Sequence, residues 1–324
     1  MAQQIQLTLT PAEAADRDTF TRLFAKKAGI NIEDIIKLQI VSKSIDARRP
    51  PVKVNMAARI FTDINDDSYM IPPFEAKDVS RAPEVLIAGA GPAGLFAALT
   101  LIEQGLKPVI IERGKRVGDR KRDVAAISTK HTINPDSNYA FGEGGAGTFS
   151  DGKLYTRSKK RGDIRRIYEL LYLHGAQEAI LYDSQPHIGS DVLAQVVVNI
   201  RETILEAGGT IMFSQKVTDL ITSNERVTGV KLADGRTLHG KAVILATGHS
   251  ARDTYEMLHQ HGVMMEPKGF AIGVRLEHPQ ELINQIQYHS KTPDANLPPA
   301  SYKIVKQVED RGVYSFCMCP GGFI

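Results

Sequence analysis

The clearest pattern of apolar and polar positions lies between Glu84 and Arg113. A short apolar run at 85–88 predicts a buried parallel strand, and apolar positions at 97–102 predict a helix that stops at Gly105. A second apolar run at 108–111 predicts the next strand, which leads into Glu112. Strand, helix and strand in this order predict a βαβ unit of an α/β fold.

Three glycines fill the predicted turn between the first strand and the helix. Gly89, Gly91 and Gly94 have the spacing G-x-G-x-x-G, in which the first allows the turn, the second admits a pyrophosphate and the third lets helix and strand pack closely. The free N–H groups at the helix start favour phosphate. Glu112 is spaced to accept hydrogen bonds from an adenosine ribose and to repel the 2′-phosphate of NADP. The unit therefore predicts a dinucleotide site.

The rest of the chain divides into further predicted parts. Residues 1–80 predict a small N-terminal α+β module, whose polar, proline-containing segment 63–83 is the expected linker. Residues 81–266 predict a Rossmann-like domain with inserted loops, and 267–324 predict the start of a β-rich substrate domain. The region 114–190 is irregular and basic, as expected of loops that contact a cofactor.

A helix and a β-meander are predicted after this irregular region. The helix spans 190–205, and alternating segments separated by turns predict the meander strands. A further strand at 242–245 leads into Ala246, Thr247 and Gly248. Strands are predicted at 210–213, 217–222, 227–232, 237–238, 271–276, 301–305 and 313–317.

Composition limits the function classes. A net charge of +3 is too small to indicate nucleic-acid binding, and 42% hydrophobic residues are typical of a globular protein. Cys317 and Cys319 cannot form a disulfide framework, and with no signal peptide visible at the start they favour a reducing cytoplasm. The uncharged run 85–102 has nearly the length of a membrane span, but its glycines favour a buried strand and helix. His259 and His261 do not share a helix face, so we expect no metal site.

Several blocks carry a family resemblance. Residues 84–113 together with 237–248 resemble the two-dinucleotide-binding-domain flavoprotein superfamily, which includes glutathione reductase. More narrowly, the chain resembles bacterial FAD-dependent dehydrogenases of unassigned substrate. The blocks are SIDARRPP (44–51), FGEGGAGTFSDGKLYTR (141–157), ATGHSARDTYEML (246–258), FAIGVRLEHPQ (270–280) and CMCPGG (317–322). Members of that family return to the FAD domain with a late glycine-rich segment, so the chain ending at Ile324 is expected to be C-terminally truncated.

The resemblance implies FAD as cofactor and a set of contact residues. Gly142, Gly144 and Gly147 repeat the G-x-G-x-x-G spacing without a preceding apolar strand, which argues against a second nucleotide fold. The residues alone are equally compatible with a generic glycine turn, whereas the resemblance implies a loop pressed against the pyrophosphate or the flavin ring. The implied FAD contacts are Gly89, Gly91, Pro92, Ala93, Gly94, Glu112, Arg113, Gly144, Gly145, Gly147, Thr148, Thr247 and Gly248.

Catalytic residues are not identified by the sequence, because a flavin performs the transfer chemistry itself. The candidates lie in or near the family blocks, and structural hydrogen bonding or ion pairing is the favoured role for each. They are His249, Arg252, Lys153, Arg275 and Asp151.

The resulting hypothesis is an FAD-dependent oxidoreductase acting on a small molecule, with NAD(P)H or another carrier as electron partner. An RNA-modifying or RNA-binding flavoprotein is the alternative, which requires aromatic stacking residues such as Tyr155, Tyr168 and Tyr172 in the basic region. A plain NAD-dependent dehydrogenase is compatible with the glycines alone, whereas the Ala-Thr-Gly strand favours FAD.

Overall fold

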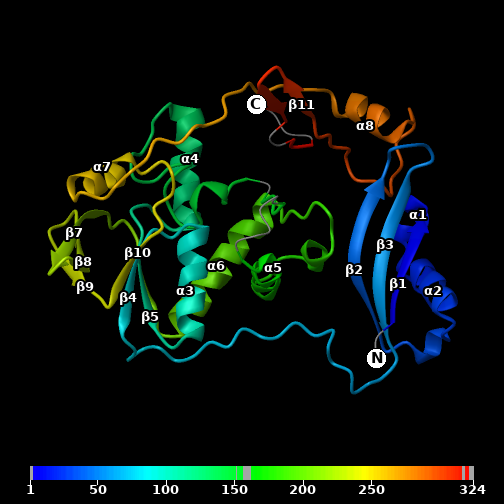
Figure 1. Cartoon of the computed structure of the whole chain (residues 1–324), viewed down its shortest axis with the longest axis horizontal. Helices are drawn as coiled ribbons and strands as arrows, with labels where there is room; N and C mark the ends of the chain where they lie inside the picture. Colours follow the sequence, from blue (N-terminus) through cyan, green and yellow to red (C-terminus); the bar gives the residue numbers. More distant parts are fainter. Residues whose placement is uncertain (1–2, 151, 156–161, 316–317, 321–324) are drawn as a thin grey trace. The chain divides into compact units, whose positions relative to one another are not determined.

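The structure is a computed structural model that describes residues 3–150, 152–155, 162–315 and 318–320. The chain forms two compact units. The first contains 1–71, 181–186 and 269–324, and the second contains 72–180 and 187–268. Figure 1 labels most of their helices and strands, and each unit is described by itself.

The first unit is built on a three-stranded antiparallel sheet. Its strands are β1 (Gln3–Leu9), β2 (Lys37–Asp46) and β3 (Lys53–Phe61), in the order β1-β3-β2. Helices α1 (Pro11–Ala15) and α2 (Arg17–Ala28) follow β1, and Thr10 and Asp16 cap their N-termini. Phe20 and Phe24 of α2 are buried against Met56 and Ile60 of β3. The α+β character expected of this segment is therefore present.

The remaining elements of this unit contain fewer strands than the sequence predicts. They are helix α8 (Gln280–Tyr288) and a hairpin of β11 (Val305–Val308) and β12 (Arg311–Tyr314). The prediction of a strand at 271–276 is wrong, because this segment has no hydrogen-bonded partner strand among the described residues. Its apolar side chains are exposed, as the 91% exposed fraction of Ile272 illustrates.

The second unit contains a four-stranded parallel sheet. Its order is β10-β4-β5-β6, formed by β4 (Glu84–Ala88), β5 (Lys107–Ile111), β6 (Thr210–Met212) and β10 (Ala242–Leu245). Successive residues of β4 face opposite sides of the sheet. The mixed α/β architecture with a parallel sheet is as predicted.

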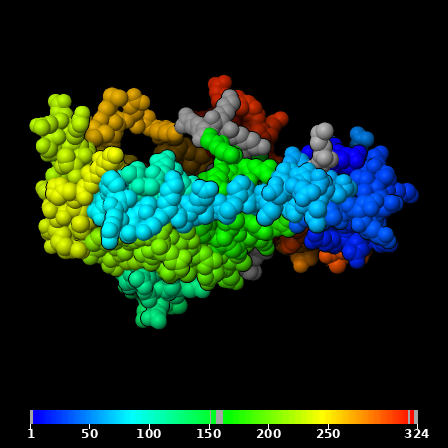
Figure 2. Space-filling view, turned by 90° about the horizontal axis from the view of Figure 1, so that it is seen from below, coloured from blue at the N-terminus to red at the C-terminus, as the bar shows by residue number. Residues whose placement is uncertain are grey.

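Helices lie on one face of this sheet and the meander on the other (Figure 1). Helix α3 (Pro92–Glu103) packs on β4 and β5, and α6 (Ser190–Glu206) packs on α3 and β6. The meander is β7 (Val217–Ser223), β8 (Arg226–Leu232) and β9 (Thr237–His239). Leu86 of β4 shares a buried cluster with Val230 of β8 and with Met257 of α7 (Arg252–Gln260). In Figure 2 the segment that leads into β4, coloured cyan, lies on the surface.

Two helices lie in the region that the sequence predicts to be irregular. They are α4 (Val117–Lys130) and α5 (Ile164–Leu173). The apolar periodicity of α4 is weak because one of its buried residues is an arginine, Arg120. Among the described residues, no helix has the length and hydropathy needed to cross a bilayer.

A buried ion pair joins α6 to the loop after α4. Arg201 Nη1 donates to both carboxylate oxygens of Glu143 at 3.0 Å, and the Val117 N–H donates to the same carboxylate at 2.7 Å. The Glu143 side chain is 1% exposed. Burial raises the pKa of Glu143 even though the Val117 amide and Arg201 act in the opposite direction. Arg201 therefore neutralises a carboxylate that has almost no access to water.

Gly94 allows the first turn of α3 to lie against β4. A Cβ atom at Gly94 would come within 2.0 Å of the Gly89 carbonyl oxygen and 3.3 Å of Ile87 Cγ2. We expect Gly94→Ala to lower the free energy of unfolding by about 1–3 kcal/mol through overpacking. Gly118→Ala is the matched control, because the added carbon meets open space beyond its chain neighbours and the backbone of its own helix. It should stabilise α4 by up to about 1 kcal/mol. Equal denaturation midpoints for the two variants would contradict this packing.

Arg201→Gln should lower stability in a pH-dependent manner. It leaves a buried unpaired carboxylate, a change that costs about 3–5 kcal/mol. The folded-state pKa of Glu143 then rises further above its unfolded value. The loss of stability relative to wild type should be full above the pKa of Glu143 in the folded variant. It should shrink as the pH falls through that pKa, because the Glu143 carboxyl group then becomes neutral in the folded variant. Denaturation of wild type and variant at pH 8 and pH 5 measures this.

Arg165→Gln is the control for that measurement, because the Arg165 side chain is 68% exposed and pairs with Glu169 one turn further along α5. Surface pairs of this kind contribute about 0–1 kcal/mol. A deficit of Arg201→Gln that grows on acidification would show that Glu143 is not the group responsible.

Candidate functional site

The candidate site begins at the glycine turn between β4 and α3. Gly89 has φ +112°, which favours glycine, and Gly91 is the N-cap of α3. Among the described residues, no side chain caps this helix. Pro92 and Ala93 are exposed. The first-turn N–H groups therefore keep their capacity for an anionic partner.

The turn lies where the strand order of the sheet reverses. From β4 the chain proceeds through β5 and β6 on one side, whereas β10 pairs with β4 on the other. Such a reversal creates a crevice at the carboxyl ends of the strands. Ala246, after β10, is so close that a Cβ at Gly89 would come within 2.4 Å of its carbonyl oxygen. Thr247 is half-buried, and Gly248 is exposed with φ +73°.

The Glu112 carboxylate connects this turn to two later segments. The N–H of Ala90 donates to one carboxylate oxygen at 2.7 Å. The N–H groups of Gly114 and Gly142 donate to the other at 2.8 and 3.0 Å. Glu112 is 4% exposed. These backbone partners were not predicted from the sequence, and contact with a ribose remains a prediction.

A second glycine segment, 142–148, packs against the first. The Gly144 N–H donates to the Ala90 carbonyl at 2.8 Å, and a Cβ at Gly145 would lie 3.1 Å from Gly91 Cα. The Thr148 hydroxyl donates within the same segment, to the carbonyls of Glu143 and Gly145. Ala146 and Gly147 are exposed. The two segments therefore lie together, as the hypothesis of a common cofactor site requires.

Arg120 organises this second segment from α4. Its guanidinium donates to the carbonyls of Asn138, Tyr139 and Glu143 at 2.8, 2.9 and 2.8 Å. Arg120 is 0% exposed, and burial lowers its pKa to about 10 despite the nearby Glu112 and Glu143. It therefore stays charged at neutral pH, and its charge-assisted hydrogen bonds fix the backbone of the loop.

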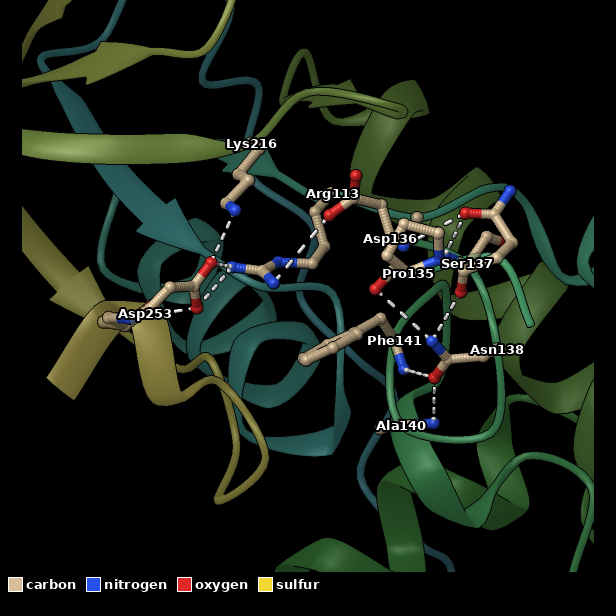
Figure 3. A network of polar contacts seen from close by, with 12 residues as sticks. Arg113, Pro135, Asp136, Ser137, Asn138, Ala140, Phe141, Lys216 and Asp253 are labelled. Atoms are coloured by element: carbon tan, nitrogen blue, oxygen red, sulfur yellow. Dashed lines mark hydrogen bonds and ion pairs between the residues drawn. The ribbon is translucent and has the colours of Figure 1, made fainter. Parts of the chain in front are cut away.

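Arg113 is held by a polar network at the end of β5 (Figure 3). Its Nη2 donates to both carboxylate oxygens of Asp253 at 2.9 and 2.8 Å. Lys216 Nζ lies 2.6 Å from the same carboxylate, and the guanidinium lies 4.4 Å from the centre of the Phe141 ring. Arg113 thereby connects β5, α7 and the segment before the second glycine loop.

The candidate catalytic residues come from separate segments of the chain. His249 is exposed and lies 3.3 Å from the Ser250 hydroxyl, and Arg252 is exposed at the start of α7. Lys153 forms an isolated bridge with His187, and Arg275 belongs to the other unit. Asp151 and Cys317 lie outside the described residues. Across the part of the chain that is described, no group of three or more His, Cys, Asp or Glu residues could hold a metal ion.

Sequence reasoning missed the residues that hold the loops. Arg120 was counted only as one of the cations of the basic region 114–190, and Arg201 was not singled out in the predicted helix 190–205. No periodic pattern marks an arginine that points inward. Glu143 lies inside the quoted block FGEGGAG, so a carboxylate between glycines was the one available signal. Lys216 and Asp253 are separated by 37 positions, and only the fold brings them together.

The geometry fits a diphosphate-containing dinucleotide. The helix start is uncapped and accessible, and the second segment approaches it through Gly144 and Gly145, beside Ala90, Gly91 and Pro92. Gly91, Ala93, Gly94 and Gly147 would hold such a group through backbone N–H groups.

Comparison with protein families gives three matches. Residues 84–251 match the model described as FAD dependent oxidoreductase. Residues 269–324 match FAD-dependent protein, C-terminal domain-like, and residues 1–61 match a domain of unknown function.

Two curated relatives are similar in sequence. An uncharacterized protein of Clostridium beijerinckii is 40% identical over 329 residues, which covers 95% of this chain and 61% of that protein. The digeranylgeranylglycerophospholipid reductase of Methanocella arvoryzae is 28% identical over 51% of this chain and 39% of its own length. The chain thus spans less than two thirds of either relative.

Solved structures give weaker likenesses. THI4 of Thermovibrio ammonificans has a TM-score of 0.37 and 19% identity, covering 57% of this chain and 65% of that one. A geranylgeranyl bacteriochlorophyll reductase-like protein of Thermoplasma acidophilum has a TM-score of 0.30 and 18% identity, over 53% of this chain and 40% of that one. Such scores add no argument.

Because the oxidoreductase model spans the sheet, both glycine segments and α4 to α6, the chain belongs to the FAD dependent oxidoreductase family.

Proposed function

We propose that the protein binds FAD at the glycine turn and acts as a dehydrogenase on a small-molecule substrate. The observation that carries this proposal is the packing of the 142–148 segment on the uncapped start of α3, joined through Glu112. The arrangement leaves first-turn N–H groups accessible beside the contact of Gly145 with Gly91 and Pro92. When bound, FAD supplies hydride or electron transfer through its flavin ring.

The chain's own residues would bind and orient the cofactor. The first-turn amides of α3 would hold the diphosphate, and Glu112 keeps one lone-pair position on the oxygen bonded to Ala90 for a ribose hydroxyl. Arg120 would keep the second glycine segment in place through its three short bonds to carbonyl oxygens. Preorganised donors of this kind reduce the entropy lost when a ligand binds.

The chain covers 61% of its Clostridium relative, so the substrate and the electron partner remain proposals. The reductase name of the Methanocella relative supports redox chemistry. NAD(P)H as a transient donor remains part of the proposal. The matched families and relatives do not support the RNA alternative, and the Tyr168 hydroxyl is engaged by the Leu154 carbonyl at 2.9 Å.

Gly91→Ala should separate cofactor binding from folding. Gly91 has φ −75°, and an added Cβ would lie 3.7 Å from Gly145 Cα, an ordinary contact. The fold should therefore tolerate the methyl group, which would stand in front of the N–H groups that face the diphosphate. We expect FAD affinity to fall at least about tenfold, equal to roughly 1.4 kcal/mol, with the unfolding midpoint of the flavin-free protein little changed.

Flavin absorbance after reconstitution with FAD, together with denaturation of the flavin-free chain, measures both effects. Gly118→Ala, on α4, should retain wild-type flavin content. A wild-type chain that takes up no FAD, or a Gly91→Ala variant that retains all of it, would contradict the proposed site.

A further inference from the structure

Two cationic side chains lie near Glu112, the residue expected to contact the adenosine ribose. Arg113 is the next residue in the chain, and Lys216 follows β6, the neighbouring strand. In dinucleotide folds an arginine near this acid accommodates the 2′-phosphate of NADP. By residue type alone, this site therefore carries both an acid that repels a 2′-phosphate and cations that attract one.

One carboxylate engages both cations. Asp253 accepts two hydrogen bonds from Arg113 and lies 2.6 Å from Lys216 Nζ (Figure 3). Phe141 covers a face of the guanidinium, and the Arg113 side chain is 13% exposed. Asp136 lies 3.9 Å from Arg113 Nη1. Two cations and two carboxylates thus lie within one contact network, whose formal charge is zero.

Asp253 remains ionised at neutral pH. Burial alone would raise its pKa, but hydrogen bonds from Lys216 and Arg113 hold the pKa below its usual value. Asp253 also accepts the N–H of Thr254 at 2.9 Å in the first turn of α7. A carboxylate at a helix N-terminus is favoured by the helix dipole, so the neutralising charge is fixed in position.

We infer that Asp253 is a specificity-determining residue, which occupies Arg113 and Lys216 and so makes the site select a ribose with a free 2′-hydroxyl group. The inference rests on the proposed nucleotide site. Glu112 supplies the repulsion of a 2′-phosphate, and Asp253 removes the attraction that the two cations would otherwise provide. Asp253 acts through these cations and is a positioning residue.

The test uses Asp253→Asn in the full chain after removal of flavin. Asparagine keeps the size of the side chain and one acceptor oxygen for Arg113 but removes the charge. The probes are 5′-AMP and adenosine 2′,5′-bisphosphate, which differ only in the 2′-phosphate, and calorimetry gives both dissociation constants. Wild type should prefer 5′-AMP at least about tenfold, and the variant should lose at least about tenfold of this preference, chiefly by binding the bisphosphate more tightly.

Salt dependence separates an electrostatic role from a structural one. The gain for the bisphosphate should shrink between about 50 mM and about 300 mM salt, because screening weakens the attraction of the released cations. Asp219→Asn is the matched control, since Asp219 pairs with Lys231 and His261 in the same unit and has no contact with Arg113. It changes the net charge equally and should leave the preference unchanged.

Two results would overturn the inference in different ways. If wild type binds FAD and 5′-AMP but Asp253→Asn keeps the wild-type preference, Asp253 has no role in specificity and the proposed function stands. If wild type binds neither FAD nor 5′-AMP, both the inference and the proposed nucleotide site fail.

Discussion

The site depends on one buried carboxylate that three backbone amides hold. Glu112 accepts the N–H groups of Ala90, Gly114 and Gly142, and so joins the β4–α3 turn, the end of β5 and the second glycine segment. Hydrogen bonds to a charged acceptor are roughly twice as strong as neutral ones. A single side chain therefore fixes the relative position of two loops, whose bonded residues Ala90 and Gly142 are 52 positions apart in sequence.

The buried charged groups around this carboxylate each have a polar or oppositely charged partner. Arg120, buried beside Glu112, donates to the carbonyl oxygens of Asn138, before the second glycine segment, and of Glu143, within it. Glu143 in that segment is neutralised by Arg201 of α6. A buried ion pair is costly to break, because the remaining partner keeps its full desolvation penalty. Loss of any of these contacts is therefore expected to destabilise the loops strongly.

Much of the fold was predictable because it depends on short-range patterns. The glycine spacing, the apolar runs at 85–88 and 108–111 and the turn-separated segments of the meander specify their structure locally. The predictions that failed concern segments whose local pattern does not match their surroundings in the fold. Helix α4 buries Arg120 instead of an apolar stripe, and the apolar alternation at 270–276 predicts a strand that has no partner among the described residues.

The site also combines residues that the sequence predicts with contacts that only the fold determines. Glu112 was expected from its spacing after the glycines, but its backbone partners depend on where the 142–148 segment lies in space, and one sequence carries no such information. Arg113 was expected as a cofactor contact through a family resemblance. The hydrogen bonds of Arg113 to Asp253, 140 positions later in the chain, depend on the packing of α7 beside the meander.

Amide hydrogen exchange in Glu112→Gln tests the central claim most directly. The amide group of glutamine would direct N–H donors at one of the two places where backbone N–H groups now donate, so at least one hydrogen bond is lost. Without flavin, the account predicts faster exchange at both 89–95 and 142–148, with Glu84→Gln, whose partner is the Lys107 ammonium, unchanged. Unaltered exchange in both segments of Glu112→Gln would show that the carboxylate does not hold the loops together.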